Sequence, residues 1–169
     1  MIISSVKENQ KIEKRIAITP EIAKKYLSLG FEVVLSENYG VHLGFVDEEF
    51  KQHGVKIYKD TKEVINNADI IVQLGFMSDE TNSIIKENQT LIGVFNPYEN
   101  REKIDNLVKK KINIFSLVKF SETDTILIYK PYSKNSAIKT KTTITATVPH
   151  NTNLVKLFQV FLWFSLSIK

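Results

Sequence analysis

The chain contains no cysteine, which excludes disulfide bonds, thiolate metal sites and cysteine nucleophiles. This composition fits a cytosolic protein. The N-terminal residues MIISSVKENQ also lack a basic region followed by a long apolar stretch, so no secretory signal is expected. With 169 residues, of which 43% are hydrophobic and 25% charged, the chain has the size and composition of about one globular domain.

An excess of either charge is also lacking over most of the chain. Residues 1–120 carry 17 basic and 17 acidic side chains, and the net charge of +4 comes from six lysines opposed by Glu122 and Asp124 in residues 121–169. A nucleic-acid-binding surface usually combines clustered arginines with aromatic residues. Because the chain has neither pattern, we expect no nucleic-acid partner.

Glycine and acidic residues are both confined to the earlier part of the chain. All six glycines lie at or before Gly93, and no acidic residue follows Asp124. The composition therefore predicts an N-terminal domain of residues 1–119 and a divergent, basic tail of residues 120–169. We interpret the tail either as a native appendage or as the product of a frameshifted or truncated reading frame.

The last portion of this tail is apolar. Residues 154–169, LVKLFQVFLWFSLSIK, are interrupted by Lys156 and Gln159, so the segment is too short and too polar for a membrane span. Two interpretations stay open. The segment lies on a membrane or partner surface as an amphipathic stretch, or it is an exposed apolar end without a function.

Short apolar runs alternate with amphipathic stretches throughout residues 1–118. β-Branched and aromatic residues predict strands at residues 2–6, 31–36, 55–58, 69–74, 90–95 and 112–118. Helices are expected between them, at residues 20–29, 47–53, 60–67, 78–88 and 100–111. The alternation predicts an α/β fold with a doubly wound, mostly parallel sheet of the Rossmann-like or flavodoxin-like kind. Two further β-like runs, TILIY and TTITATV, lie in the tail.

Polar residues follow three of the expected strands, at the edge where such sheets bind ligands. Arg15 lies in the loop after the first strand, where its guanidinium could clamp a carboxylate or a phosphate through two hydrogen bonds. Gln73 and Asn96 end two later strands, so their amides would reach the same crevice. Each also has a simpler interpretation: Arg15 as a surface residue paired with Glu13 or Glu21, and the two amides as helix caps or turn residues.

Motifs for catalysis, metal binding and dinucleotide binding are missing. His42, His53 and His150 are scattered, without the spacing of a metal site, and no serine, histidine and acid arrangement is visible. The G-x-G-x-x-G fingerprint is also lacking, since the nearest pair of glycines is Gly40 and Gly44. From its residues alone, the chain is an α/β domain with a candidate anion site, and its catalytic residues stay unknown.

Several segments of residues 1–118 nevertheless combine into a known pattern. The sequence KE is followed by IEKRIAITP, then by LGFEV and FVDEEF, and later by NADIIVQL and TLIGVFNPYEN. These segments resemble the N-terminal domain of the alanine dehydrogenase and pyridine-nucleotide transhydrogenase family, most specifically at R-I-A-I-T-P. The IGVFNPYEN stretch is more similar to the transhydrogenase alpha subunit, because alanine dehydrogenases usually carry a Y-x-H-x-A pattern there.

The resemblance implies a proton-translocating NAD(P) transhydrogenase, in which hydride passes between NAD(H) and NADP(H). It also implies a homodimer that works with membrane-embedded subunits, in the cytoplasm and peripherally at the inner membrane. In this family the domain is joined to a Rossmann domain that binds NAD(H). Because these 169 residues contain no such domain, we expect the chain to be inactive by itself.

Two departures from the family pattern bear on this expectation. Gln73 stands where the family usually has a lysine that faces the cleft. The P-R-I-[ST]-R-A-Q-S-M-D motif after the last shared strand is replaced here by VKFSETDTILIYKPYSKN. Two alternatives therefore stay open: a remnant of an alanine dehydrogenase, which would oxidise alanine to pyruvate with NAD, and a binding or assembly domain without catalysis.

Overall fold

The computed structural model describes residues 1–120, 123–129 and 142–144, with side chains described for residues 1–117. Its elements in chain order are β1 (Ile2–Ser5), α1 (Pro20–Ser28), β2 (Glu32–Ser36), η1 (Val41–Leu43), α2 (Asp47–Gln52), β3 (Lys56–Tyr58), α3 (Thr61–Asn66), β4 (Ile70–Val72), α4 (Asp79–Ile84), β5 (Thr90–Gly93), α5 (Arg101–Lys109), β6 (Asn113–Phe120), β7 (Thr123–Tyr129) and β8 (Thr142–Ile144). None of the described helices has the length and hydropathy needed to cross a membrane.

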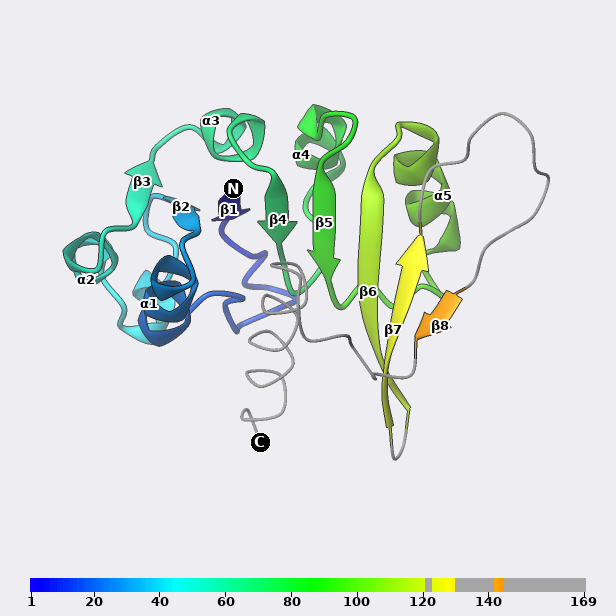
Figure 1. The fold of residues 1–169 in the computed structure, drawn as a ribbon, viewed down its shortest axis with the longest axis horizontal. Coiled ribbons are helices and arrows are strands. Elements are labelled where there is room, and N and C mark those ends of the chain that lie inside the picture. Colours follow the sequence, from blue (N-terminus) through cyan, green and yellow to red (C-terminus); the bar gives the residue numbers. More distant parts are fainter. Residues whose placement is uncertain (121–122, 130–141, 145–169) are drawn as a thin grey trace.

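The strands lie side by side in one sheet, in the order β3-β2-β1-β4-β5-β6-β7-β8 (Figure 1). Strands β1 to β6 are parallel, whereas β7 and β8 are antiparallel to their neighbours. The chain adds strands outward from β1 to β3, returns to the other side of β1, and continues from β4 to β6. The winding therefore reverses between β1 and β4, where such sheets open a crevice at the carboxyl ends of the two strands.

Every strand and helix predicted within residues 1–118 is present, so the prediction of an α/β, mostly parallel fold is confirmed. The helix expected at residues 78–88 is shorter than predicted. It ends because Ile85 is extended, with ψ at 127°, and the Gln89 side chain accepts the Lys86 N–H at 2.7 Å.

In the tail, the TILIY run lies in β7 and the TTITATV run begins in β8. β6 continues to Phe120 because β7 pairs with it, in a register that runs from Ile114 opposite Tyr129 to Phe120 opposite Thr123. The apolar segment 154–169 and His150 lie outside the described residues. The division into a domain of residues 1–119 and a tail of residues 120–169 stays a prediction.

Helices cover both faces of the sheet. α1 and α2 pack on one face, where Phe50 of α2 contributes to the core, and α3 and α5 pack on the other, where Ile104 of α5 does so. Within β4, Ile70 belongs to the first core and Ile71 to the second. Burial on both faces explains why β4 is an uninterrupted apolar run.

Local signals determine both ends of α1. Thr19 Oγ1 accepts the Ile22 N–H at 3.3 Å, and Pro20 occupies the first turn of the helix. At the other end, Gly30 has a left-handed φ of +84°, and its N–H donates to the Leu27 carbonyl at 3.0 Å. The caps hold α1 in place and thereby fix the end of the loop that leads into it from β1.

The carboxyl ends of β4 and β5 approach each other through main-chain atoms. The Gln73 N–H donates to the Ile92 carbonyl at 2.9 Å. A Cβ atom on Gly93 would overlap both the Gln73 carbonyl oxygen and the Phe95 ring. Only glycine therefore fits at the end of β5, beside the reversal point of the sheet.

Replacing Gly93 by alanine should lower the free energy of unfolding by about 1–3 kcal/mol, because a methyl group would be forced into packed main chain. Urea unfolding followed by circular dichroism measures this loss. Gly75→Ala is the matched control, since an added Cβ there meets nothing within 4 Å, and it should be neutral or stabilising by up to about 1 kcal/mol. Equal stability of Gly93→Ala and the unmodified chain would contradict the close approach.

Candidate functional site

The loop between β1 and α1 carries the R-I-A-I-T-P segment into the core. Ile16, Ala17 and Ile18 are at most 1% exposed, although they belong to no helix or strand. Their buried main-chain groups therefore need hydrogen-bond partners from elsewhere. The N–H groups of Ala17 and Ile18 both donate to the hydroxyl oxygen of Tyr39, at 3.1 Å each. A buried side chain from the loop after β2 thus holds the segment in place.

The Tyr39 hydroxyl also begins a chain of buried hydrogen bonds that reaches the reversal point. It lies 2.8 Å from Ser5 Oγ, and the Ser5 hydroxyl donates to Gln73 Oε1 at 2.7 Å. The Gln73 amide continues to Val6, accepting its N–H at 2.9 Å and donating to its carbonyl at 3.2 Å. Burial raises the pKa of the Tyr39 hydroxyl, so this group stays protonated. Because the single hydroxyl proton of Ser5 goes to Gln73, Tyr39 is the donor to Ser5.

A crevice of about 460 Å³ opens beside this chain of hydrogen bonds, between the loops that follow β1 and β4. Its volume lies within the usual range for small-molecule sites. The lining residues are Val6, Lys7, Glu8, Asn9, Ile12, Thr61, Gln73, Phe76, Met77, Ser78, Asp79, Thr81 and Lys103. The crevice thus lies at the place where the winding of the sheet predicts a ligand site.

One margin of the crevice combines the aromatic ring of Phe76 with charges of both signs. The rings of Phe76 and Phe95 are stacked, with centroids 4.6 Å apart. The Lys103 Nζ lies 5.9 Å from the centroid of Phe76 and 3.9 Å from the Asp79 carboxylate. A planar, polar group fits this chemistry, because it could contact an aromatic face and a cation together.

Glu8 is a candidate functional residue that sequence reasoning missed. It is only 6% exposed, and its Oε1 accepts the Leu74 N–H at 2.6 Å. Burial raises the pKa of the Glu8 carboxyl to about 7, although the hydrogen bond from Leu74 opposes this effect. A carboxyl that titrates near neutral pH in a crevice can hold or release a proton there. Nothing in the sequence KEN signals this burial, since lysine, glutamate and asparagine after a strand usually form an exposed loop.

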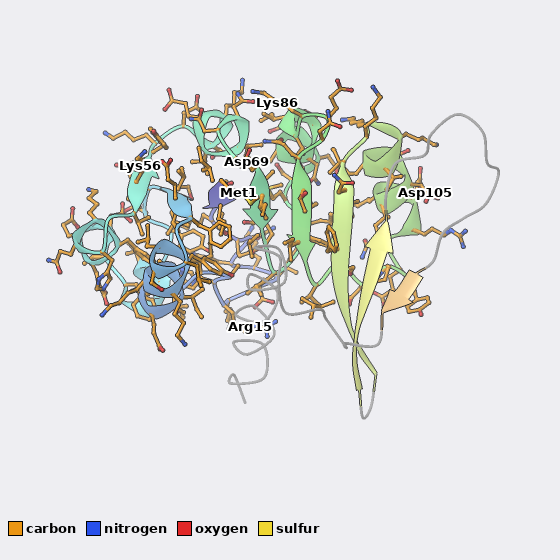
Figure 2. The ribbon with its side chains drawn as sticks, in the orientation of Figure 1. Met1, Arg15, Lys56, Asp69, Lys86 and Asp105 are labelled. Carbon is orange, nitrogen blue, oxygen red and sulfur yellow. The ribbon has the colours of Figure 1, made fainter. Side chains whose placement is uncertain are left out.

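Arg15 lies at the same end of the sheet as the crevice (Figure 2), but it does not line the crevice. Its Nε and Nη2 atoms donate to the Glu13 carboxylate at 2.9 and 2.7 Å, and its side chain is 52% exposed. Glu21, the other partner considered for Arg15, pairs instead with Lys25 at 3.3 Å. A ligand-binding role for Arg15 stays a prediction.

The other two predicted site residues lie in different surroundings. Gln73 forms the buried floor of the crevice, and its amide points inward to Ser5 and Val6 rather than toward a ligand. Asn96 is exposed, lies outside the crevice lining and has a left-handed φ of +43°. Its carbonyl accepts the N–H of Asn100 at 3.0 Å and thereby forms the turn into α5. Ligand-binding roles for Gln73 and Asn96 also stay predictions.

Two of the three histidines have structural roles. His42 Nε2 lies 2.7 Å from the carbonyl oxygen of Lys14 and connects η1 to the loop after β1. His53 caps the end of α2. Within the portion of the chain that the structure describes, no group of three His, Cys, Asp or Glu side chains could hold a metal ion.

Residues 5–130 match the family model described as the alanine dehydrogenase/PNT N-terminal domain. A NAD(P) transhydrogenase subunit alpha protein of Rickettsia prowazekii is 36% identical over 121 residues, which cover 69% of this chain and 32% of that protein. Alanine dehydrogenase 1 of Staphylococcus aureus is 26% identical over 116 residues, 69% of this chain and 31% of that protein. The chain therefore spans about a third of the length of these relatives.

Among solved structures, the transhydrogenase from Sinorhizobium meliloti is similar with a TM-score of 0.65 and 25% sequence identity. The similar region covers 72% of this chain and 37% of that chain. Most of this chain is therefore similar in fold to part of a transhydrogenase of known structure.

Tyr39→Phe should lower the free energy of unfolding by about 2–3 kcal/mol, because the buried N–H groups of Ala17 and Ile18 lose their acceptor. Tyr26→Phe is the matched control. Tyr26 is also fully buried, but its hydroxyl has no hydrogen-bond partner among the described residues, so its removal should be neutral or stabilising by about 1 kcal/mol. Urea unfolding of both variants tests the contrast, and equal losses would contradict it.

Because of Glu8, the free energy of unfolding should fall as the pH rises from about 4.5 to about 7. The first value is the ordinary pKa of the carboxyl and the second is its pKa in the folded protein. The folded carboxyl binds its proton more tightly than the unfolded one. The contribution of Glu8 to the free energy of unfolding is therefore complete below pH 4.5. It is lost as the pH rises through the folded pKa of about 7. The full change amounts to roughly 3 kcal/mol.

Urea unfolding across this pH range measures the effect in Glu8→Gln, which cannot titrate at this position. The difference in unfolding free energy between the variant and the unmodified chain should change by about 3 kcal/mol across the range. The control Glu21→Gln removes an exposed carboxylate and should give a curve parallel to that of the unmodified chain. A parallel curve for Glu8→Gln would contradict the prediction.

Proposed function

Because the chain belongs to the alanine dehydrogenase/PNT N-terminal domain family, we propose that it acts as the N-terminal domain of a NAD(P) transhydrogenase alpha subunit. The complete enzyme would transfer hydride between NAD(H) and NADP(H). Identity is higher to the Rickettsia transhydrogenase subunit, at 36%, than to the Staphylococcus alanine dehydrogenase, at 26%, which supports this branch of the family. Since the chain has no dinucleotide fingerprint, a separate Rossmann domain would hold the NAD(H), and the chain alone would be inactive.

The observation that carries the proposal is that the side chain at the floor of the crevice, Gln73, is uncharged and already hydrogen-bonded within the protein. Its amide is uncharged, and its oxygen and nitrogen are already bonded to Ser5 and Val6. Oxidation of an amino acid or reduction of a keto acid is helped by a cation that polarises the reacting carbonyl or imine. Hydride transfer between two nucleotides has no such group to polarise. The uncharged Gln73, which replaces a lysine usual in the whole family, therefore weighs against the alanine dehydrogenase alternative and is compatible with transhydrogenation.

The chain's own residues would form one wall of the reaction site. NAD(H), when bound by a separate domain, would supply or accept the hydride. Phe76, which stacks on the buried Phe95, would exclude water and contact a planar group, while Lys103 would attract an anionic portion of the nucleotide. Glu8 would hold the loop after β4 through its hydrogen bond to the Leu74 N–H.

We further propose that the domain works within a homodimer, together with membrane-embedded subunits that translocate the proton. The domain would then lie in the cytoplasm, peripherally at the inner membrane. Support comes from the Rickettsia relative, whose name describes it as belonging to a subunit.

The proposal predicts that residues 1–118 can replace the matching stretch of the Rickettsia subunit. The chimaera should transfer hydride from NADH to a NADP⁺ analogue whose reduced form absorbs at its own wavelength, when it is combined with the other subunits of that enzyme in membrane vesicles. Activity within about tenfold of the parent is expected, because the interface outside the crevice is not matched to its new partner.

Two controls accompany the chimaera. The chain alone should give no hydride transfer, and the Rickettsia subunit without its N-terminal stretch should give none either. A folded chimaera that is inactive in transhydrogenation would overturn the proposal. Alanine-dependent reduction of NAD⁺ by the chimaera would instead identify the chain as a remnant of an alanine dehydrogenase.

A further inference from the structure

Exposed apolar side chains gather on two loops of the domain. Across residues 1–117, the large apolar side chains that are exposed are those of Met1, Ile12, Val41, Leu43, Val46 and Tyr98. Ile12 lies in the loop after β1 and is 84% exposed. Val41, Leu43 and Val46 lie between β2 and α2 and are about half exposed. Most of the exposed apolar side chains therefore belong to the loops that follow two adjacent strands.

Hydrogen bonds hold the two loops against each other. His42 Nε2 lies 2.7 Å from the carbonyl oxygen of Lys14, which places η1 beside the loop after β1. The Leu43 N–H donates to the Gly40 carbonyl at 2.9 Å, so η1 is a tight turn. Together the two loops form an apolar patch of Ile12, Val41, Leu43 and Val46. Apolar side chains that gather on one surface mark an interaction site, whereas single ones do not.

The described strands of the tail lead the chain back to the edge of the sheet that carries this patch. β7 is antiparallel to β6, and β8 is antiparallel to β7, so β8 runs in the same direction as β1 to β6. In Figure 1 the arrowheads of β4 and β8 accordingly point toward the same edge. The chain therefore leaves β8 at Ile144 on the edge where the loops after β1 and β2 lie.

The chain beyond β8 is also long enough to reach the patch. Five strand spacings separate β8 from β1, which is about 24 Å along the sheet. Nine residues, 145–153, precede the apolar segment 154–169, and an extended stretch of that length spans up to about 30 Å. Eleven of the sixteen residues in the segment are apolar and none is acidic. The segment therefore has the composition of an occupant for an apolar surface.

We propose that the apolar patch is the docking surface for residues 154–169 of the same chain. Docking removes apolar side chains of the patch and of the segment from water together. Because the segment is tethered to β8, it acts at an effective concentration in the millimolar range, so a small patch is sufficient. The docked segment also covers Ile12, which lines the crevice, and narrows access to the crevice from that side. This docking goes beyond the proposed function and does not depend on it, because it involves this chain alone.

Trp163 makes the docking measurable in the full-length chain, since it is the only tryptophan and lies within the segment. In the unmodified chain its fluorescence should have the short-wavelength maximum of a buried indole, and acrylamide should quench it weakly. Leu43→Asp combined with Val46→Asp places two charges in the patch. This variant should shift the docking equilibrium at least about a hundredfold toward the undocked state. Its emission should move to longer wavelength, and quenching by acrylamide should increase.

A second patch variant and a matched control accompany this measurement. Leu43→Ser combined with Val46→Ser should shift the equilibrium in the same direction by at least about tenfold. Tyr98→Asp changes an exposed apolar side chain that follows β5 at the same edge of the sheet, outside the patch. It should leave the emission of Trp163 unchanged. Circular dichroism verifies that each variant is folded.

Four results would overturn the proposal. One is the emission of a solvent-exposed indole in the unmodified chain, and another is unchanged emission in both folded patch variants. A short-wavelength maximum only at high protein concentration would instead indicate docking onto a second copy. A short-wavelength maximum only with vesicles of phosphatidylcholine and phosphatidylglycerol would indicate a membrane surface. The chimaera that tests the proposed function contains residues 1–118 and lacks the segment, so the two proposals fail independently.

Discussion

The structure depends on one buried hydroxyl group, that of Tyr39. Without it, the N–H groups of Ala17 and Ile18 would be buried with no acceptor, which would destabilise the passage of the loop between β1 and α1 through the core. The same hydroxyl donates to Ser5, which in turn orients the Gln73 amide between the ends of β1 and β4. The apolar R-I-A-I-T-P segment, the floor of the crevice and the reversal of the sheet are therefore joined in one polar network.

Two carboxyl groups near Arg15 have opposite pKa shifts, because one is hydrogen-bonded to Arg15 and the other is buried. Glu13 and Glu8 both lie close enough to Arg15 for its charge to act on them, but all three hydrogen bonds described for Arg15 go to Glu13. Glu8 has only backbone N–H groups, those of Leu74 and Gly75, as its hydrogen-bond donors, and burial outweighs them and raises its pKa. One carboxyl is thereby kept ionised at the surface, while the other becomes a neutral-pH acid in the crevice.

The sequence predicted the fold well because its signals are local. Strands buried on both faces are read as apolar runs, and α1 has its cap at Thr19 and Pro20. The crevice was also predictable, since it follows from the winding of the sheet. The pairing of Arg15 with Glu13 and the turn at Asn96 were among the interpretations of the sequence, but the orientation of Gln73 was not. Gln73 was expected to point into the crevice, but its partners Ser5 and Val6 lie 68 and 67 residues away in the chain. Such pairs, like the burial of Glu8, arise only once β1 and β4 are neighbours.

Gly93 has a consequence for how this site can evolve. Its main chain packs against the main chain of Gln73, so the backbone of the crevice floor has one contact that does not involve the side chain at residue 73. This contact would remain if that side chain and its hydrogen bonds to Ser5 and Val6 were exchanged. A lineage could exchange an amide for a cation at this position and acquire a different reaction without rebuilding the sheet, which is a physical route by which one domain can serve two kinds of oxidoreductase.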